Sequence, residues 1–127
     1  MTKAPSLKQV IMFHASTIEE QGGEAGLRDE GLLDAAISAP FQTFGEQDLF
    51  PSLIEKAARL AFGILKNHPF IDGNKRIGMY VMIAFLEVNG IPINAGNEDV
   101  TRVGLALGDG SMKYDELLHW IHDKQIV

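Results

Sequence analysis

Residues 77–88, IGMYVMIAFLEV, form the segment that most constrains the fold of this 127-residue chain. Placed on a helix, they would be apolar on nearly every side, and a helix of that kind is stable only when other helices surround it. The longest apolar run, Ile77–Leu86, is shorter than the roughly 20 residues that span a bilayer. We therefore expect this segment to be a buried helix of a globular bundle.

The rest of the chain reads as helices separated by short turns. Six helices are expected from apolar spacing and from the residues at their ends: from Ser6 to Gly22–Gly23, from residue 26 to Pro40, from Ser52 to about Asn67, from about Asn74 to Asn89, from Asn97 to about Leu107, and from Ser111 to about Gln125. Residues 41–51 have no clear period and are expected to be a loop with a short extended or helical piece. The predicted fold class is all-α: a compact helical bundle with little or no sheet, forming one domain over residues 1–127.

Composition narrows the class of protein. The net charge of -6 gives little attraction for nucleic acid, whose non-specific binding depends on basic surface. The chain has no cysteine, which excludes disulfides, thiolate zinc sites and a cysteine nucleophile. Its first ten residues, MTKAPSLKQV, lack the apolar core of a signal peptide. We expect a cytoplasmic protein that binds neither nucleic acid nor a membrane directly.

Residues 67–78, NHPFIDGNKRIG, place polar and basic groups at the start of the apolar helix. The first N–H groups of a helix have no partner within it, and the helix dipole makes this end positive. Gly73 allows a ligand to approach closely, and Lys75 and Arg76 add two cations. Together these features predict an anion site that suits a phosphate.

His68 and Asp72 flank this expected anion site. An imidazole titrates near neutral pH and can take a proton from a hydroxyl, and a carboxylate suits Mg²⁺ held with phosphates. A base, a metal ligand and a phosphate cradle this close together point to phosphoryl or nucleotidyl transfer. The alternative is that these are common turn and cap residues beside solvated charges, an interpretation that fits each residue taken singly.

The stretch HPFIDGNKR, residues 68–76, resembles the signature of the Fic/Doc family, H-x-F-x-[D/E]-[G/A]-N-[G/K]-R. The segments GLRDEGLLDAAISAP, EKAARLAFGILKNHPF and FLEVNG also resemble the Doc branch, the death-on-curing toxins of toxin–antitoxin modules. The resemblance covers essentially the whole chain and implies a small helical bundle, in agreement with the helices expected above.

The resemblance also implies a role for each motif position. His68 would be the general base that deprotonates a target hydroxyl, Phe70 the buried anchor of the loop, and Asp72 the Mg²⁺ ligand. Gly73 and Asn74 would shape the phosphate cradle and hydrogen-bond phosphate. Arg76 would hold a nucleotide phosphate, with Lys75 beside it.

Two positions depart from most Fic proteins, which transfer AMP. Lys75 stands where those proteins have glycine, and Met79 stands where they have a second arginine. Doc-type proteins share the lysine and resemble kinases that bind ATP in the reversed orientation, so that the γ-phosphate meets the hydroxyl. The resemblance thus implies a kinase that uses ATP and Mg²⁺ and whose target class is elongation factor Tu. AMP transfer to a protein hydroxyl is the alternative.

The resemblance implies a protein inhibitor as well. Some Fic enzymes are held inactive by a glutamate in the motif [S/T]-x-x-x-E-[G/N]; Ser16 and Glu20 have this separation, but Gln21 follows, so we interpret the segment as an ordinary helix surface. Doc-type toxins are instead neutralised by a Phd-like antitoxin, which is the partner expected here.

Three further hypotheses concern other classes of site or protein. His119 and His122 lie three residues apart with no third ligand nearby, and we expect them to be surface residues rather than metal ligands. A catalytically silent binding module of the same fold stays open. So does a nuclease toxin, which the acidic charge disfavours.

Overall fold

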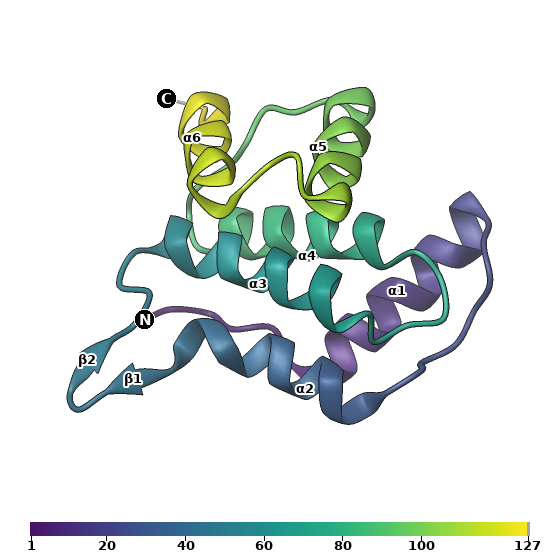
Figure 1. The fold of residues 1–127 in the computed structure, drawn as a ribbon, viewed down its shortest axis with the longest axis horizontal. Coiled ribbons are helices and arrows are strands. Elements are labelled where there is room, and N and C mark those ends of the chain that lie inside the picture. The colour runs from purple at the N-terminus through teal and green to yellow at the C-terminus, as the bar shows by residue number, and fades with distance from the viewer. Residues whose placement is uncertain (127) are drawn as a thin grey trace.

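A computed structural model describes residues 1–126 as a bundle of six α-helices (Figure 1), which confirms the predicted fold class. The helices are α1 (Leu7–Gln21), α2 (Glu30–Ser38), α3 (Leu53–Asn67), α4 (Asn74–Val88), α5 (Asn97–Asp109) and α6 (Tyr114–Lys124). A 3-10 turn, η1 (Ala39–Phe41), and an antiparallel hairpin, β1 (Thr43–Phe44) and β2 (Gln47–Asp48), join α2 to α3.

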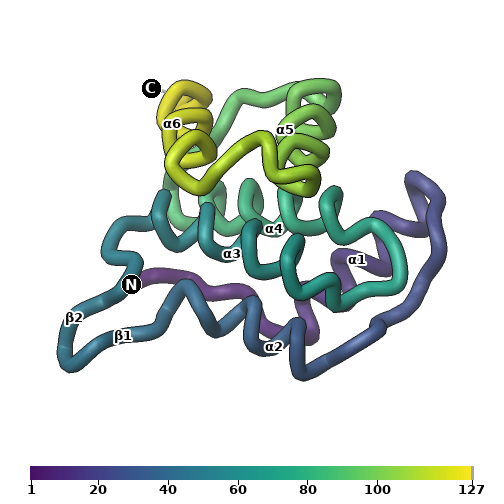
Figure 2. Tube along the Cα trace, in the orientation of Figure 1, coloured from purple at the N-terminus to yellow at the C-terminus, as the bar shows by residue number. Residues whose placement is uncertain are grey.

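Helices α3 and α4 form the centre of the bundle and pack against each other more extensively than any other pair. Figure 1 shows α5 and α6 on one side of this pair and α1 and α2 on the other. The tube in Figure 2 shows the same layering by residue number, with the two ends of the chain covering opposite sides of α3 and α4. No helix within residues 1–126 is both long and apolar enough to cross a membrane.

The apolar segment 77–88 lies in α4 and is largely buried, as the sequence predicts. Four of its side chains are completely enclosed: Ile77, Met79, Met82 and Leu86. Burying one side chain of this size stabilises the fold by about 1.5–3 kcal/mol relative to leaving it exposed. Only the C-terminal end emerges, where Val88 is exposed. The core therefore holds the start of α4 in place, and this also fixes the end of the preceding loop, residues 68–73, where it joins the helix.

Three helices begin at other residues than the sequence indicates. Helix α2 begins at Glu30, four residues after the expected start, and Asp29 is its cap. Gly96 is the residue before α5, and Asn97 is already helical, so Asn97 does not cap this helix. Ser111 does not cap α6, which begins three residues later. The hydroxyl of Ser111 donates instead to the carbonyl oxygen of Ala106, in the last turns of α5. A serine can serve the end of one helix as readily as the start of the next, and the local sequence does not distinguish the two.

The hairpin of β1 and β2 occupies the region expected to be a loop with a short extended piece. The amine of Lys56 in α3 is buried; it lies 3.2 Å from the Asp48 carboxylate and donates to the carbonyl oxygen of Phe50. These contacts fix the base of the hairpin. Phe44 at its tip is 81% exposed, whereas Phe50 is half-buried beside Tyr114.

Gly63 permits the close approach of α3 to α2. A Cβ added at Gly63 would lie 3.1 Å from the Cβ and 3.2 Å from the Cα of Ala36. Because a backbone atom cannot retreat without shifting α2, we expect overpacking of about 1–3 kcal/mol to exceed the ~1 kcal/mol gained when alanine replaces a helical glycine. Gly63→Ala should therefore lower the free energy of unfolding measured with urea.

Gly31→Ala in α2 is the matched control, since a Cβ there would meet only the Asp29 side chain, at 3.4 Å. This change should leave the free energy of unfolding unchanged or raise it by up to about 1 kcal/mol. Equal stabilisation by both substitutions would contradict the proposed crowding.

Candidate active site

The loop of residues 68–73 joins α3 to α4 and carries the candidate base. His68 ends α3 with φ 50° and ψ 54°, and it is the only non-glycine residue within 1–126 with a positive φ. This left-handed conformation costs roughly 1–2 kcal/mol, so neighbouring groups must hold it. Arg28 does so: its Nε donates to the carbonyl oxygen of His68 (2.7 Å) and its Nη2 to that of Asn67 (2.9 Å). The imidazole itself is exposed.

Residues 26–29 run beside this loop and hold its backbone. The N–H groups of residues 28 and 29 both donate to the carbonyl oxygen of Pro69, at 2.6 and 3.0 Å. The N–H of Ile71 donates in turn to the carbonyl oxygen of Gly26, at 3.0 Å. A segment distant in sequence thus fixes the path of the loop.

Asn74 closes the loop from inside. Its side-chain Oδ1 accepts a hydrogen bond from the N–H of Phe70 (3.0 Å), and its Nδ2 donates to the carbonyl oxygen of the same residue (2.9 Å). Both residues are buried, Phe70 at 1% and Asn74 at 4% exposed. Phe70 is therefore the buried anchor that the family resemblance implies. The side-chain amide of Asn74 is engaged within the loop, which leaves its backbone N–H as its group available to a phosphate.

His14 of α1 contacts the loop of residues 68–73 and supports it, a role that the sequence did not predict. Its ring stacks on Phe70, with 3.8 Å between centroids and 7° between planes. Its Nε2 lies 2.7 Å from the carbonyl oxygen of Asp72 and, because a carbonyl only accepts, must donate there. The available signal was a histidine within the apolar stripe of α1, a position where a buried polar group needs a partner.

Helix α4 begins without a side-chain cap, whereas serines cap α1 and α3. Gly73 precedes it with φ 77°, and the first N–H groups that follow have no acceptor within the helix. A Cβ at Gly73 would lie 3.2 Å from Nη2 of Arg76 and 3.6 Å from Nε2 of His14, so glycine keeps this end open. The geometry fits the anion cradle that the sequence predicts.

The carboxylate of Asp72 is held by backbone N–H groups at the edge of the cradle. Its Oδ2 accepts from Glu24 (2.9 Å) and its Oδ1 from Gly73 (2.8 Å). These bonds, first that from Glu24, lower the pKa of Asp72 below its ordinary value, and the charges of Arg76 and His14 act in the same direction. Each oxygen keeps lone pairs, so an ionised Asp72 can still bind a cation.

Arg76 is oriented by the end of α1. Its Nη2 donates to the carbonyl oxygen of Gly22 (3.0 Å) and its Nη1 to Oε1 of Gln21 (3.4 Å). Gln21 also bonds the hydroxyl of Tyr80, with its Nε2 at 2.9 Å. The Nε of Arg76 is buried and has no acceptor within residues 1–126. The guanidinium therefore retains a donor, although Gln21 and Gly22 already accept from two others.

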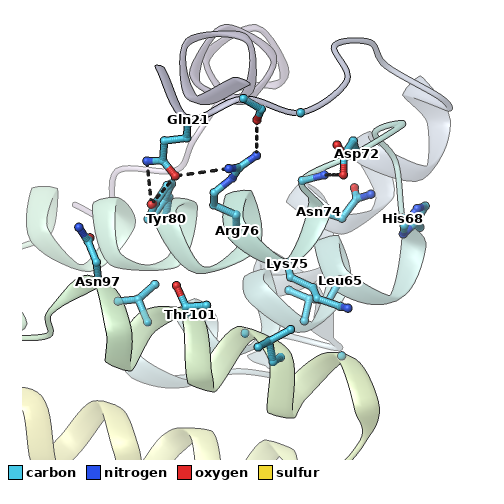
Figure 3. Close-up of a pocket in the computed structure, with 17 residues that line it drawn as sticks. Gln21, Leu65, His68, Asp72, Asn74, Lys75, Arg76, Tyr80, Asn97 and Thr101 are labelled. Carbon is cyan, nitrogen blue, oxygen red and sulfur yellow. Dashed lines mark hydrogen bonds between the residues drawn. The ribbon is translucent and has the colours of Figure 1, made fainter. Parts of the chain in front are cut away.

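One cleft of about 940 Å³ brings all the expected site residues together. It is lined by the six motif residues His68, Asp72, Gly73, Asn74, Lys75 and Arg76 and by residues of α1, α3, α4 and α5. Figure 3 shows His68 and Asp72 at one end, Arg76 in the middle and Asn97 at the other end. The side chain of Lys75 crosses to α5, where a Cβ on Gly108 would lie 3.0 Å from its Cδ.

Asp72 is the carboxylate in this cleft that fits a metal. Within residues 1–126, no three or more His, Cys, Asp or Glu side chains gather as a metal cluster. Mg²⁺ commonly binds through one or two carboxylates together with phosphate oxygens and water. The residues present therefore fit Mg²⁺ that arrives with a nucleotide. Separately, His119 and His122 are exposed on α6, where the sequence analysis expected surface residues.

Comparison with known proteins gives concordant results. Residues 4–86 match the model of the Fic/DOC family. Toxin Doc of Mycolicibacterium smegmatis is 43% identical over 81 residues, which are 64% of this chain and 62% of that protein, so the match spans less than two thirds of the relative. Protein kinase doc of Escherichia phage P1 is 29% identical over 109 residues, 84% of this chain and 85% of that protein.

Asn74→Ala should destabilise the protein strongly. The substitution leaves the N–H and carbonyl groups of Phe70 buried without partners, at about 1–3 kcal/mol for each group. We expect the free energy of unfolding in urea to fall by about 2–4 kcal/mol. Asn94→Ala, which removes the same amide from an exposed position, should change it by less than about 0.5 kcal/mol. Equal effects of the two substitutions would contradict the closure of the loop by Asn74.

Asp72 should titrate at an unusually low pH. Because its pKa is lowered in the folded protein, its ionised form stabilises the fold above the ordinary pKa, and this contribution is lost as the pH falls through the folded-state pKa. A ¹³C NMR titration of the carboxyl carbons, with Asp72→Asn to assign the signal, should give a midpoint below 3.8. A midpoint at or above that value would contradict the two backbone hydrogen bonds.

Proposed function

The chain belongs to the Fic/DOC family, and from this premise we propose that it is a Doc-type toxin that transfers the γ-phosphate of ATP to a hydroxyl of a translation factor of the elongation factor Tu class. The observation that carries the proposal is the single cleft that gathers an exposed imidazole, a carboxylate, an uncapped helix start and two cations. The relative named Protein kinase doc supports phosphoryl transfer.

His68 would act as the base. Its imidazole is exposed at one end of the cleft, while its backbone is held by Arg28, so the ring can reach a hydroxyl of a docked protein without the loop moving. In the reaction, the target oxygen bonds to the γ-phosphorus and the bond to the β–γ bridging oxygen breaks. The hydroxyl proton passes to His68 and ADP leaves.

The start of α4 would hold the phosphates. Its free N–H groups, its dipole and the cations Lys75 and Arg76 offset the charge that spreads over the phosphoryl oxygens in the transition state. Asp72 would hold Mg²⁺, which neutralises phosphate charge when bound. The buried loop and core keep these groups in a fixed geometry, so little reorganisation is needed when charge develops.

Lys75 favours transfer of the γ-phosphate over transfer of AMP. Its side chain extends to Gly108 of α5 and lines the cleft. We expect it to take space that a nucleoside joined to the reacting phosphate would need. The terminal phosphate requires less room there and gains from the ammonium charge. Transfer of AMP to the same hydroxyl remains the second candidate because the family includes such enzymes.

We also propose a Phd-like antitoxin as the regulatory partner and the cytoplasm as the place of action. The support is the relative named Toxin Doc, since a toxin of the producing cell requires neutralisation, and a translation factor is a cytoplasmic target. In the motif segment considered above, Arg76 donates to Gln21, whereas Glu20 is exposed and forms no ion pair with Arg76 among the described residues, so Glu20 does not fit the role of the inhibitory glutamate of other Fic proteins.

The test is a pair of labelling reactions with Mg²⁺ and bacterial lysate, one with ATP labelled at the γ-phosphate and one at the α-phosphate. We expect a protein labelled from the γ-phosphate only, with label lost in His68→Ala. His119→Ala, at an exposed histidine outside the cleft, is the control that should keep full labelling. Label from the α-phosphate would instead establish AMP transfer, and no label from either would contradict both transfer reactions and leave a silent binding module, a nuclease toxin or a different substrate.

A further inference from the structure

Gly108 is a glycine that the backbone of α5 does not require. It lies in the last turn of the helix, its φ is not positive and it is exposed, so neither a tight turn nor close packing of the core explains it. Glycine is a poorer helix former than alanine, so this residue lowers the stability of α5. The reason for a glycine at this position must therefore come from a neighbouring group.

That neighbour is the side chain of Lys75. A Cβ built on Gly108 would overlap Cε of Lys75 and would lie 3.0 Å from its Cδ and 3.3 Å from its Nζ, and these are the three nearest atoms. Gly104, one turn earlier on α5, is different, because a Cβ there would lie 3.5 Å from its nearest neighbour, Cγ of Met79, which is ordinary van der Waals contact. Of these two glycines, Gly108 is the one that leaves a space occupied by the lysine side chain.

The contact with Gly108 restrains the ammonium group of Lys75, which lies in the cleft between α4 and α5 (Figure 3). With its methylene stem against the backbone of α5, the lysine loses rotamers that a free surface lysine would populate. The carboxylate of Asp109 acts on the same group: hydrogen bonds from Ser111 lower the pKa of Asp109, and the charge of Lys75 adds to this effect. A cation whose position is set before a phosphate arrives loses less conformational entropy on binding.

We propose that Gly108 is a positioning residue for Lys75: the space that it leaves holds the lysine stem and so fixes the ammonium group in the cleft, where a phosphate would meet it. The inference rests on the proposed function, because it takes the ligand of the cleft to be ATP. It adds a residue of α5 to those that shape the site, and it accounts for a glycine whose replacement should stabilise the helix. Gly108 itself touches no ligand and acts through the lysine.

The test is a double-mutant cycle on positions 75 and 108, in which calorimetry measures the binding of a non-hydrolysable ATP analogue with Mg²⁺. Lys75→Ala should weaken binding by about ten- to hundred-fold, because a charge-assisted hydrogen bond is lost. Gly108→Ala should weaken binding by about three- to ten-fold, because the ammonium group is displaced but not removed. In the Lys75→Ala protein, Gly108→Ala should have no further effect.

Two further measurements separate this role from a structural one. Gly108→Ala should keep or raise the free energy of unfolding in urea, since only the flexible end of Lys75 has to move. Gly96→Ala is the matched control: it precedes α5, lies outside the cleft lining, and its Cβ would meet nothing within 4 Å. This change should leave the affinity for the analogue as it is in the unchanged protein.

Each other outcome overturns the inference in a recognisable way. If the unchanged protein does not bind the analogue, the proposed function fails and the inference fails with it. If Gly108→Ala behaves like Gly96→Ala, or if Lys75→Ala has no effect, the proposed function stands without this positioning role. Equal weakening by Gly108→Ala with and without Lys75 would show that the substitution shifts α5. Tighter binding by Gly108→Ala would show that the space at Gly108 holds the ammonium group away from the ligand.

Discussion

The two hydrogen bonds between the Asn74 amide and the backbone of Phe70 are the constraint on which the site depends. They close a short loop onto the first residue of a helix whose remaining turns are fixed in the core. A buried amide with both ends satisfied is costly to disturb, because opening the loop would leave polar groups without partners. The loop therefore behaves as a part of α4, and the exposed imidazole of His68 is carried on a rigid support.

Helix α1 and the segment after it complete this support from a distant part of the chain. His14 stacks on Phe70 and bonds the Asp72 carbonyl, the N–H of Glu24 bonds the Asp72 carboxylate, and Gly22 accepts from Arg76. Each of the three hydrogen bonds uses the main chain on one side, so it constrains position more than residue type. An acidic protein can thus hold a small cationic site, because neighbouring groups orient its cations toward the cleft. The uncapped start of α4 adds positive potential through the helix dipole without adding a charged residue.

The sequence predicted the approximate extents of the helices and which motif residues line one cleft, but not the hydrogen bonds among them. The apolar segment 77–88 predicted a buried helix, and the motif 68–76 predicted which residues share a cleft. The sequence did not predict which partner each polar side chain would bond. The amide of Asn74 bonds the buried backbone of Phe70, and the hydroxyl of Ser111 bonds Ala106 in α5 rather than the start of α6. The role of His14 could not be predicted because its hydrogen-bond partner Asp72 lies 58 residues along the chain, beyond any local pattern. Caps and loop closures are decided by such contacts, and spacing alone does not specify them.

The most direct test of this account is a crystal structure of the protein with Mg²⁺ and a non-hydrolysable ATP analogue. The account predicts that the terminal phosphate lies nearest the imidazole of His68, with phosphate oxygens on the first N–H groups of α4. An α-phosphate nearest His68 would contradict the direction of binding argued from Lys75. A nucleotide bound away from the start of α4 would contradict the central claim that this loop and helix form a nucleotide site.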